Sequence, residues 1–240
     1  PSSPPAATAT TGPEPVAPSS LRDIVAGLEG LSIDQFFDQS YRQLLLRDPE
    51  YLTAVSLSEA FGLRDDRLRN LSDSYVRETQ ELEAAILDLL HTYDRDQLTP
   101  QQQTSYDVYE WYLQDTVDSL PFIYHGFPAT YSGYGTQRDT QRFFTDIHPL
   151  STEQDANDYI TRLNAVRGKF EQLAEHLELQ RQAGIVEPQL TMQVARNQVS
   201  AIAQGNAASN PFYTSFVAKI EDIPGLTEPD KQDLRDRAYA

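Results

Sequence analysis

The chain has 240 residues, 39% of them apolar, and its 36 acidic and 19 basic residues give a formal net charge of −17. The length allows one large helical domain or two small ones, and the acidic balance argues against binding to nucleic acid or to an anionic membrane surface. The chain has no cysteine, which excludes disulfides, thiolate metal sites and cysteine nucleophiles.

Residues 1–31 are predicted to be a flexible linker, because a segment rich in Pro, Ala, Ser and Thr cannot bury a core. The chain contains no apolar run long enough to span a bilayer, and any signal peptide is expected to be already absent from this sequence. A Pro/Ser/Thr tether at a mature amino terminus often holds an exported domain away from a membrane anchor. We therefore expect an extracytoplasmic location, exported or membrane-tethered, with no direct membrane insertion.

Residues 32–240 are predicted to form one helical domain. A capping box over residues 32–35 opens its first helix, which should end before Pro49. Further helices are expected, in chain order, over about 72–93, 99–120, 140–147, 152–183, 188–204, 212–220 and from 227 onward. A short polar link predicts that the helices at 72–93 and 99–120 form an antiparallel hairpin. No segment has a strand pattern, so the fold class is all-α, an irregular multi-helix array with antiparallel helix hairpins.

Residues 121–139 interrupt the helical periodicity with Gly, Pro and aromatic side chains. Long loops of this kind within a helical scaffold are often binding segments. Tyr124, His125, Tyr131 and Tyr134 are therefore the candidate substrate-binding residues. The alternative is a loop that its own rings pack over the core.

A second group of rings lies on the helix expected over 99–120. It consists of Tyr106, Tyr109, Trp111 and Tyr112. We interpret this group as part core and part interface, because base stacking would require accompanying Lys or Arg and this helix has none.

The four histidines do not form a metal motif, since no two have the spacing that puts two ligands on one helix face and none is followed by Glu. His91 is expected to complement the dipole at a helix end, and His148 to cap a helix end or pack there. His176 is expected on a solvated polar face. We therefore assign no catalytic residue, no metal ligand and no cofactor to this chain.

Several short stretches, in order along the chain, resemble one bacterial family. They are Tyr41-Arg-Gln-Leu-Leu-Leu-Arg-Asp-Pro49, Phe143-Phe-Thr-Asp-Ile-His-Pro-Leu150, Asp155-Ala-Asn-Asp-Tyr-Ile-Thr-Arg-Leu163, Ala183-Gly-Ile-Val-Glu-Pro188 and Asn210-Pro-Phe-Tyr213. The resemblance is to the domain-of-unknown-function family 885, which is placed with zinc metallopeptidases, and it covers about residues 32–240. It implies a helical, gluzincin-like protein of several hundred residues with a His-Glu zinc helix in its later half. That motif is missing here.

The resemblance therefore implies that these residues are an amino-terminal lobe that forms one wall of a peptide cleft. The final helical pattern has no stop signal, which indicates a truncated chain. Zinc is expected only in the missing carboxy-terminal part, and the implied partners are a peptide substrate and the carboxy-terminal half of the same protein. The alternatives are a stand-alone helical binding module of an exported or lipid-anchored protein without enzymatic activity, and a structural helical array.

Overall fold

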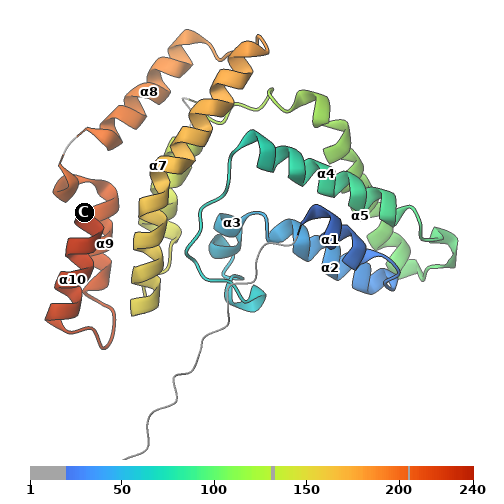
Figure 1. Ribbon diagram of the computed structural model, residues 1–240, viewed down its shortest axis with the longest axis horizontal. Coiled ribbons are helices and arrows are strands. Elements are labelled where there is room, and N and C mark those ends of the chain that lie inside the picture. The colour runs from blue at the N-terminus through green and yellow to red at the C-terminus, as the bar shows by residue number, and fades with distance from the viewer. Residues whose placement is uncertain (1–19, 131–132, 205) are drawn as a thin grey trace, which may run out of the picture.

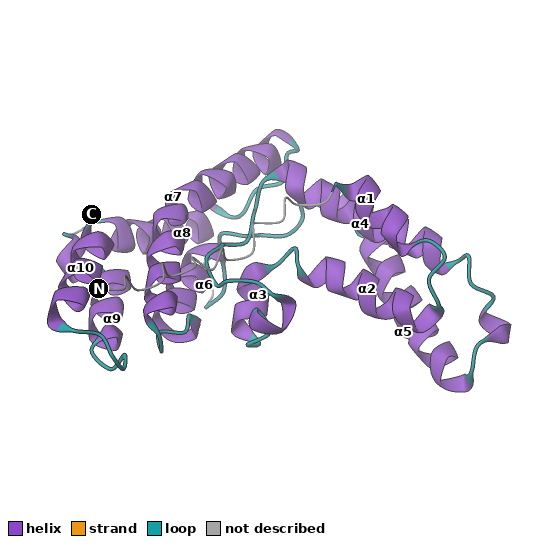
Figure 2. Ribbon diagram, turned by 60° about the horizontal axis from the view of Figure 1, so that its bottom comes forward, coloured by secondary structure: helices purple, strands orange, loops and turns teal. Residues whose placement is uncertain are grey.

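The computed structural model describes residues 20–130, 133–204 and 206–240, and the regular secondary structure in this part of the chain is all helical, with no strand (Figures 1 and 2). The all-α prediction is confirmed. The α-helices are α1 (Leu21–Leu28), α2 (Ile33–Leu45), α3 (Pro49–Ala54), α4 (Asp73–Leu90), α5 (Pro100–Asp118), α6 (Thr136–Arg142), α7 (Glu153–Gln182), α8 (Gln189–Ala203), α9 (Pro211–Ile220) and α10 (Glu228–Tyr239). None of the described helices combines the length and the apolarity needed to cross a membrane.

Helix α1 corrects the predicted linker, which was expected to extend to residue 31. The Ser20 side chain accepts a hydrogen bond from the backbone N–H of Asp23 and so caps the helix. Leu28 is 2% exposed, and α1 packs against α4. Apolar residues at helical spacing follow directly after the Pro-rich stretch, and they bury one face of α1. Residues 1–19 lie outside the described residues, so the linker prediction stays a prediction there.

Helices α1, α2, α4 and α5 surround an amino-terminal core, on the right of Figure 1. Its buried members are Leu28, Ile33, Phe36, Leu82, Ile86, Leu87, Leu90, Tyr106 and Leu113. Helices α4 and α5 pack together as the predicted hairpin. Sequence patterning placed both helices within about three residues of their observed ends.

Helices α7, α9 and α10 and a π-helix over Phe143–Ile147 surround a carboxy-terminal core, on the left of Figure 1. Its buried members are Phe143, Phe144, Ala156, Tyr159, Ile160, Phe212, Phe216, Ile220, Ile223 and Leu234. The brief helix predicted at 140–147 is instead α6 followed by this π-helix. The His148 N–H bonds to the Phe143 carbonyl, and the Lys219 ammonium donates to the Thr145 carbonyl. These bonds stabilise the π-helix, whose turn is wider than that of an α-helix.

A polar junction joins the amino-terminal half to α7, and we define it as Thr53, Ser58, Asp65 and Arg162. The Asp65 carboxylate accepts hydrogen bonds from the hydroxyls of Thr53 and Ser58, each at 2.6 Å. The fully buried Arg162 guanidinium donates to the Thr53 hydroxyl at 2.7 Å and lies 3.7 Å from Asp65. Nearby, the Lys169 ammonium of α7 donates to the Glu50 carboxylate of α3. The two halves are thus connected by charge and hydrogen bonds.

Candidate functional site

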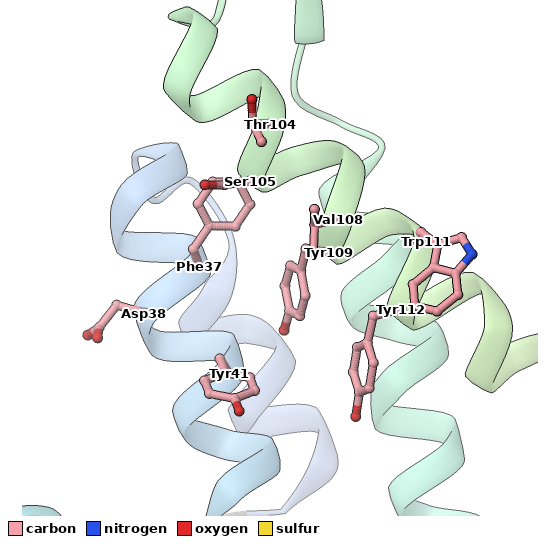
Figure 3. Close-up of a pocket in the computed structure, with 9 residues that line it drawn as sticks. All are labelled: Phe37, Asp38, Tyr41, Thr104, Ser105, Val108, Tyr109, Trp111 and Tyr112. Atoms are coloured by element: carbon pink, nitrogen blue, oxygen red, sulfur yellow. The ribbon is translucent and has the colours of Figure 1, made fainter.

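A groove of about 720 Å³ lies between α2 and α5 (Figure 3). The residues that line it are Phe37, Asp38, Tyr41, Thr104, Ser105, Val108, Tyr109, Trp111 and Tyr112. Spacings of three and four residues put the lining side chains of each helix on the surface that faces the other helix. Trp111 is 70% exposed and Val108 is 63% exposed. Neighbouring exposed apolar side chains of this size are typical of a binding surface.

Two hydrogen-bonded ties hold α2 against α5 and so fix the width of the groove. At the start of α5, the side chain of Gln102 completes a capping box with Thr99 and donates to the Asp34 carboxylate of α2 at 3.0 Å. Further along, the Ser40 hydroxyl of α2 lies 3.0 Å from the Tyr109 hydroxyl of α5. The groove therefore lies between two helices whose separation the fold sets.

Tyr109 forms the inner wall of the groove. The single proton of the Ser40 hydroxyl is donated to the Phe36 carbonyl at 2.6 Å, so Tyr109 is the donor in the bond to Ser40. Burial raises the pKa of Tyr109 to about 12. The ring packs edge-on against Phe37, with centroids 6.0 Å apart. Tyr109 is therefore a neutral, fixed side chain at any physiological pH.

Tyr112 and Tyr41 form the outer part of the groove and are 42% and 49% exposed. The Tyr112 ring is nearly parallel to that of Tyr109, with centroids 6.4 Å apart. Burial raises the pKa of Tyr112, and the nearby Glu83 carboxyl and the Tyr41 hydroxyl raise it further. Figure 3 shows the hydroxyls of Tyr41, Tyr109 and Tyr112 pointing toward the same end of the groove.

One carboxyl group lines the groove, and a second lies outside the lining but acts on two of its tyrosines. Asp38 lines it, exposed on α2, and is the charged residue of the lining. Glu83 lies on α4, is 9% exposed and acts electrostatically on both Tyr109 and Tyr112. Burial raises the pKa of Glu83 to about 7, and the positive charge of Arg47 opposes that shift. No lysine or arginine lines the groove.

The substrate-binding residues predicted from sequence lie elsewhere. The Tyr124 hydroxyl donates to Asp73 and accepts from Arg77 on α4, each at 2.9 Å. The Gln180 amide of α7 donates to the carbonyls of Tyr124 and Gly126. These contacts anchor the predicted binding loop between α4 and α7, and they give Tyr124 a structural role.

Of the other three predicted residues, the structure describes His125 and Tyr134. The exposed His125 ring packs edge-on against Phe122, with centroids 5.3 Å apart, and Tyr134 is 76% exposed. Tyr131 lies outside the described residues. The role of these residues in substrate binding stays a prediction. The groove was missed as a site, although Trp111 and Tyr112 had been singled out from the sequence as core plus interface.

The three histidines outside the predicted binding loop differ in their burial and contacts. His148 is 2% exposed and packs against Phe144 and Tyr159, as the packing alternative predicted. His91 follows the last residue of α4, and its Nε2 lies 2.8 Å from a Glu110 carboxylate oxygen. His176 was predicted on a solvated face but is half-buried, with its ring 5.6 Å from that of Tyr124. Burial lowers its pKa.

A zinc donor set is not found in the part of the chain that the structure describes. Among residues 20–130, 133–204 and 206–240, no group of three or more His, Cys, Asp or Glu side chains could hold a metal ion. The family resemblance implied zinc only in the missing carboxy-terminal part, and that expectation stays a prediction.

Comparisons with known proteins extend these observations. The fold is similar to that of a "putative lipoprotein" from Colwellia psychrerythraea, whose crystal structure superposes with a TM-score of 0.72 at 19% sequence identity. The match covers 92% of this chain but only 38% of that one, so this chain spans well under half of its structural neighbour. No curated protein matches the chain. A family model matches residues 49–240, later than the predicted start at residue 32 but over most of the chain. The chain thus belongs to the family described as "Bacterial protein of unknown function (DUF885)".

Proposed function

We propose that this chain is a non-catalytic helical lobe of a longer extracytoplasmic protein, and that the α2–α5 groove binds peptide. The proposed location draws on the lipoprotein description of the structural neighbour. The peptidase-like character draws on the family resemblance alone. In this proposal any zinc-dependent chemistry comes from polypeptide outside these 240 residues, and the lobe contributes substrate contacts.

The observation that carries the proposal is the groove itself. Its volume of about 720 Å³ lies within the range of about 300–1,000 Å³ that is usual for ligand pockets. Aromatic rings that are rigid and part polar provide large contact area at a low entropic cost, which is why Tyr and Trp are enriched at recognition surfaces. The rings of Tyr41, Trp111 and Tyr112 have these properties.

The lining favours a peptide over other polymers. Thr104, Ser105 and Tyr41 offer hydroxyl groups that can bond to the amide groups of an extended segment, while the rings accept its side chains. A nucleic acid would require Lys or Arg beside the rings to neutralise phosphates. The lining holds no such residue, and the protein carries a net charge of −17.

Intrinsic fluorescence tests the proposal directly, because Trp111 is the only tryptophan of the chain and lines the groove. Titration with a pepsin digest of casein should shift its emission to the blue, with saturation, as peptide replaces water around the indole. If the wavelength of maximum emission does not change at peptide concentrations up to about 1 mM, any affinity is very weak, and peptide binding in this groove is contradicted.

A matched pair of arginine variants serves as the control. Val108→Arg places a long charged side chain in the groove, and Leu190→Arg places one on α8. Both positions are highly exposed, at 63% and 74%, so neither change should disturb the core. The emission shift should disappear in Val108→Arg and persist in Leu190→Arg. Equal behaviour of the two variants would place the binding outside the groove.

A further inference from the structure

The α2–α5 groove carries a charge pattern that its aromatic character alone does not require. Asp38 lines it, and the Glu83 carboxyl lies close enough to act on two of its tyrosines. Within the described residues Glu83 makes no hydrogen bond and no ion pair. Its oxygens are not among the fully buried polar atoms without a partner, so solvent reaches this carboxyl group beside the groove.

Two arginines of the amino-terminal half are bonded to groups outside the groove. The Arg47 guanidinium is bonded to Glu78 and Thr79 and lies over the Tyr75 ring, 3.9 Å from its centroid. The Arg42 guanidinium lies over the Phe61 ring and donates to the Phe61 carbonyl. Neither lines the groove, so the negative charge there is left for a ligand.

The rings of the groove are suited to a positive charge. The face of an aromatic ring is electron-rich and attracts a lysine ammonium or an arginine guanidinium within about 6 Å. Tyr41 comes from α2, and Tyr112 comes from α5 across the groove (Figure 3). A cationic side chain that enters between them meets ring faces and phenol oxygens, and Asp38 adds a negative charge on the α2 side of the groove.

We infer that the groove selects peptides through a lysine or arginine side chain, which lies between Tyr41 and Tyr112 with Asp38 on α2 supplying the opposite charge. This inference rests on the proposed peptide binding by the same groove. It adds the class of ligand, a basic peptide. The charge of the whole protein adds to this preference at long range, since a protein of net charge −17 attracts cationic peptides and repels acidic ones.

Two peptides that differ at one side chain test the inference. The probes are acetyl-Ala-Ala-Lys-Ala-Ala-amide and its norleucine counterpart, which keeps the aliphatic stem and removes the charge. Titrations followed by Trp111 emission should give a dissociation constant at least about fivefold lower for the lysine peptide, which is the scale of a partly desolvated cation–π contact.

Variants test whether the preference for the lysine peptide arises at the groove. Asp38→Asn and Tyr41→Leu should each reduce the ratio of the two dissociation constants toward one, and both positions are exposed, so folding is expected to be retained. The control Asp88→Asn removes an exposed carboxylate from α4 outside the groove lining and should leave the ratio unchanged. If Asp88→Asn reduces the ratio as much as Asp38→Asn does, overall charge alone explains the preference and the inference is wrong.

The two proposals fail in different ways. If both peptides bind equally and Val108→Arg abolishes this binding, the groove remains a peptide site, but its selection of cations is overturned. No emission change with either peptide would overturn both proposals. If sedimentation shows that the chain self-associates and that Val108→Arg abolishes this self-association, both proposals are also overturned, because a second copy would then fill the groove.

Discussion

Glu83 shows how the fold sets the chemistry of a single residue. Its carboxyl is nearly buried on α4, where the lost hydration disfavours the charged form and raises the pKa from 4.5 to about 7. The positive charge of Arg47 opposes this shift only in part. Between these two values the folded chain keeps a proton that the unfolded chain has released. Folding is therefore linked to pH through this group.

Replacement of Glu83 by Gln should change the pH dependence of stability. The contribution of a raised pKa is fully present below pH 4.5 and is lost as the pH rises through about 7, so the wild type loses stability there. Since Gln stays neutral, the Tm of the variant relative to wild type should increase between about pH 5 and pH 8. An increase of about 2–4 °C corresponds to about 1 kcal/mol. Glu81→Gln, on the exposed face of α4, should show no such increase.

Sequence patterns identified residue types better than residue roles. Trp111 and Tyr112 were recognised as an interface group, because rings on an amphipathic helix must lie in a core or on a contact surface. Their partner surface on α2 could not be found, since it depends on how two helices pack. Tyr124 was assigned to ligand binding from loop composition. Its hydroxyl is bonded to Asp73 and Arg77, which lie about fifty positions earlier in the chain, and loop composition could not reveal that contact.

At the level of elements, local signals predicted most helices and missed those that tertiary contacts define. The capping box predicted over residues 32–35 opens α2, and similar boxes open α5, α7 and α10, because a cap depends on residues three positions apart. The π-helix could not be predicted, since the Lys219 ammonium that bonds to its backbone comes from α9. Helix α1 was missed because the Pro-rich segment before it dominated the composition.

The packing of α1 can be tested with one buried side chain. Leu28 is 2% exposed in the amino-terminal core, so Leu28→Ala should lower the free energy of unfolding by about 3 kcal/mol through lost burial and the cavity left behind. Leu190→Ala on α8, at a position 74% exposed, should change it by less than about 0.5 kcal/mol. Urea unfolding followed by circular dichroism measures both. Similar values for the two variants would mean that α1 does not pack on α4.

For the whole molecule, two apolar cores are joined by a polar junction. Figures 1 and 2 show the amino-terminal and carboxy-terminal helices as two groups, with α3 between them. The polar junction and the pair Glu50–Lys169 connect the groups, and an ion pair links Arg64 to Asp158. One Arg162 nitrogen, Nη1, is buried without a hydrogen-bond partner within the described structure. Cores joined in this way are expected to open separately when the junction is weakened.

Arg162→Met should separate the opening of the two cores. Arg162 is fully buried on α7 and its guanidinium lies 4.8 Å from the Phe143 ring centroid, so its loss acts first on the carboxy-terminal core. Removing one member of a buried charge pair costs about 3–5 kcal/mol. Hydrogen exchange followed by mass spectrometry should show faster exchange over residues 212–220 and unchanged exchange over residues 82–90.

Two further variants give this test its controls. Arg167→Met, on the exposed face of α7, removes only the surface pair with Glu171 and should leave both segments unchanged. The double variant Arg162→Met/Asp65→Asn also removes the carboxylate left without its partner, and it should restore part of the protection over residues 212–220. If Arg162→Met accelerates exchange equally in both segments, the two cores unfold as one cooperative unit and the junction does not separate them.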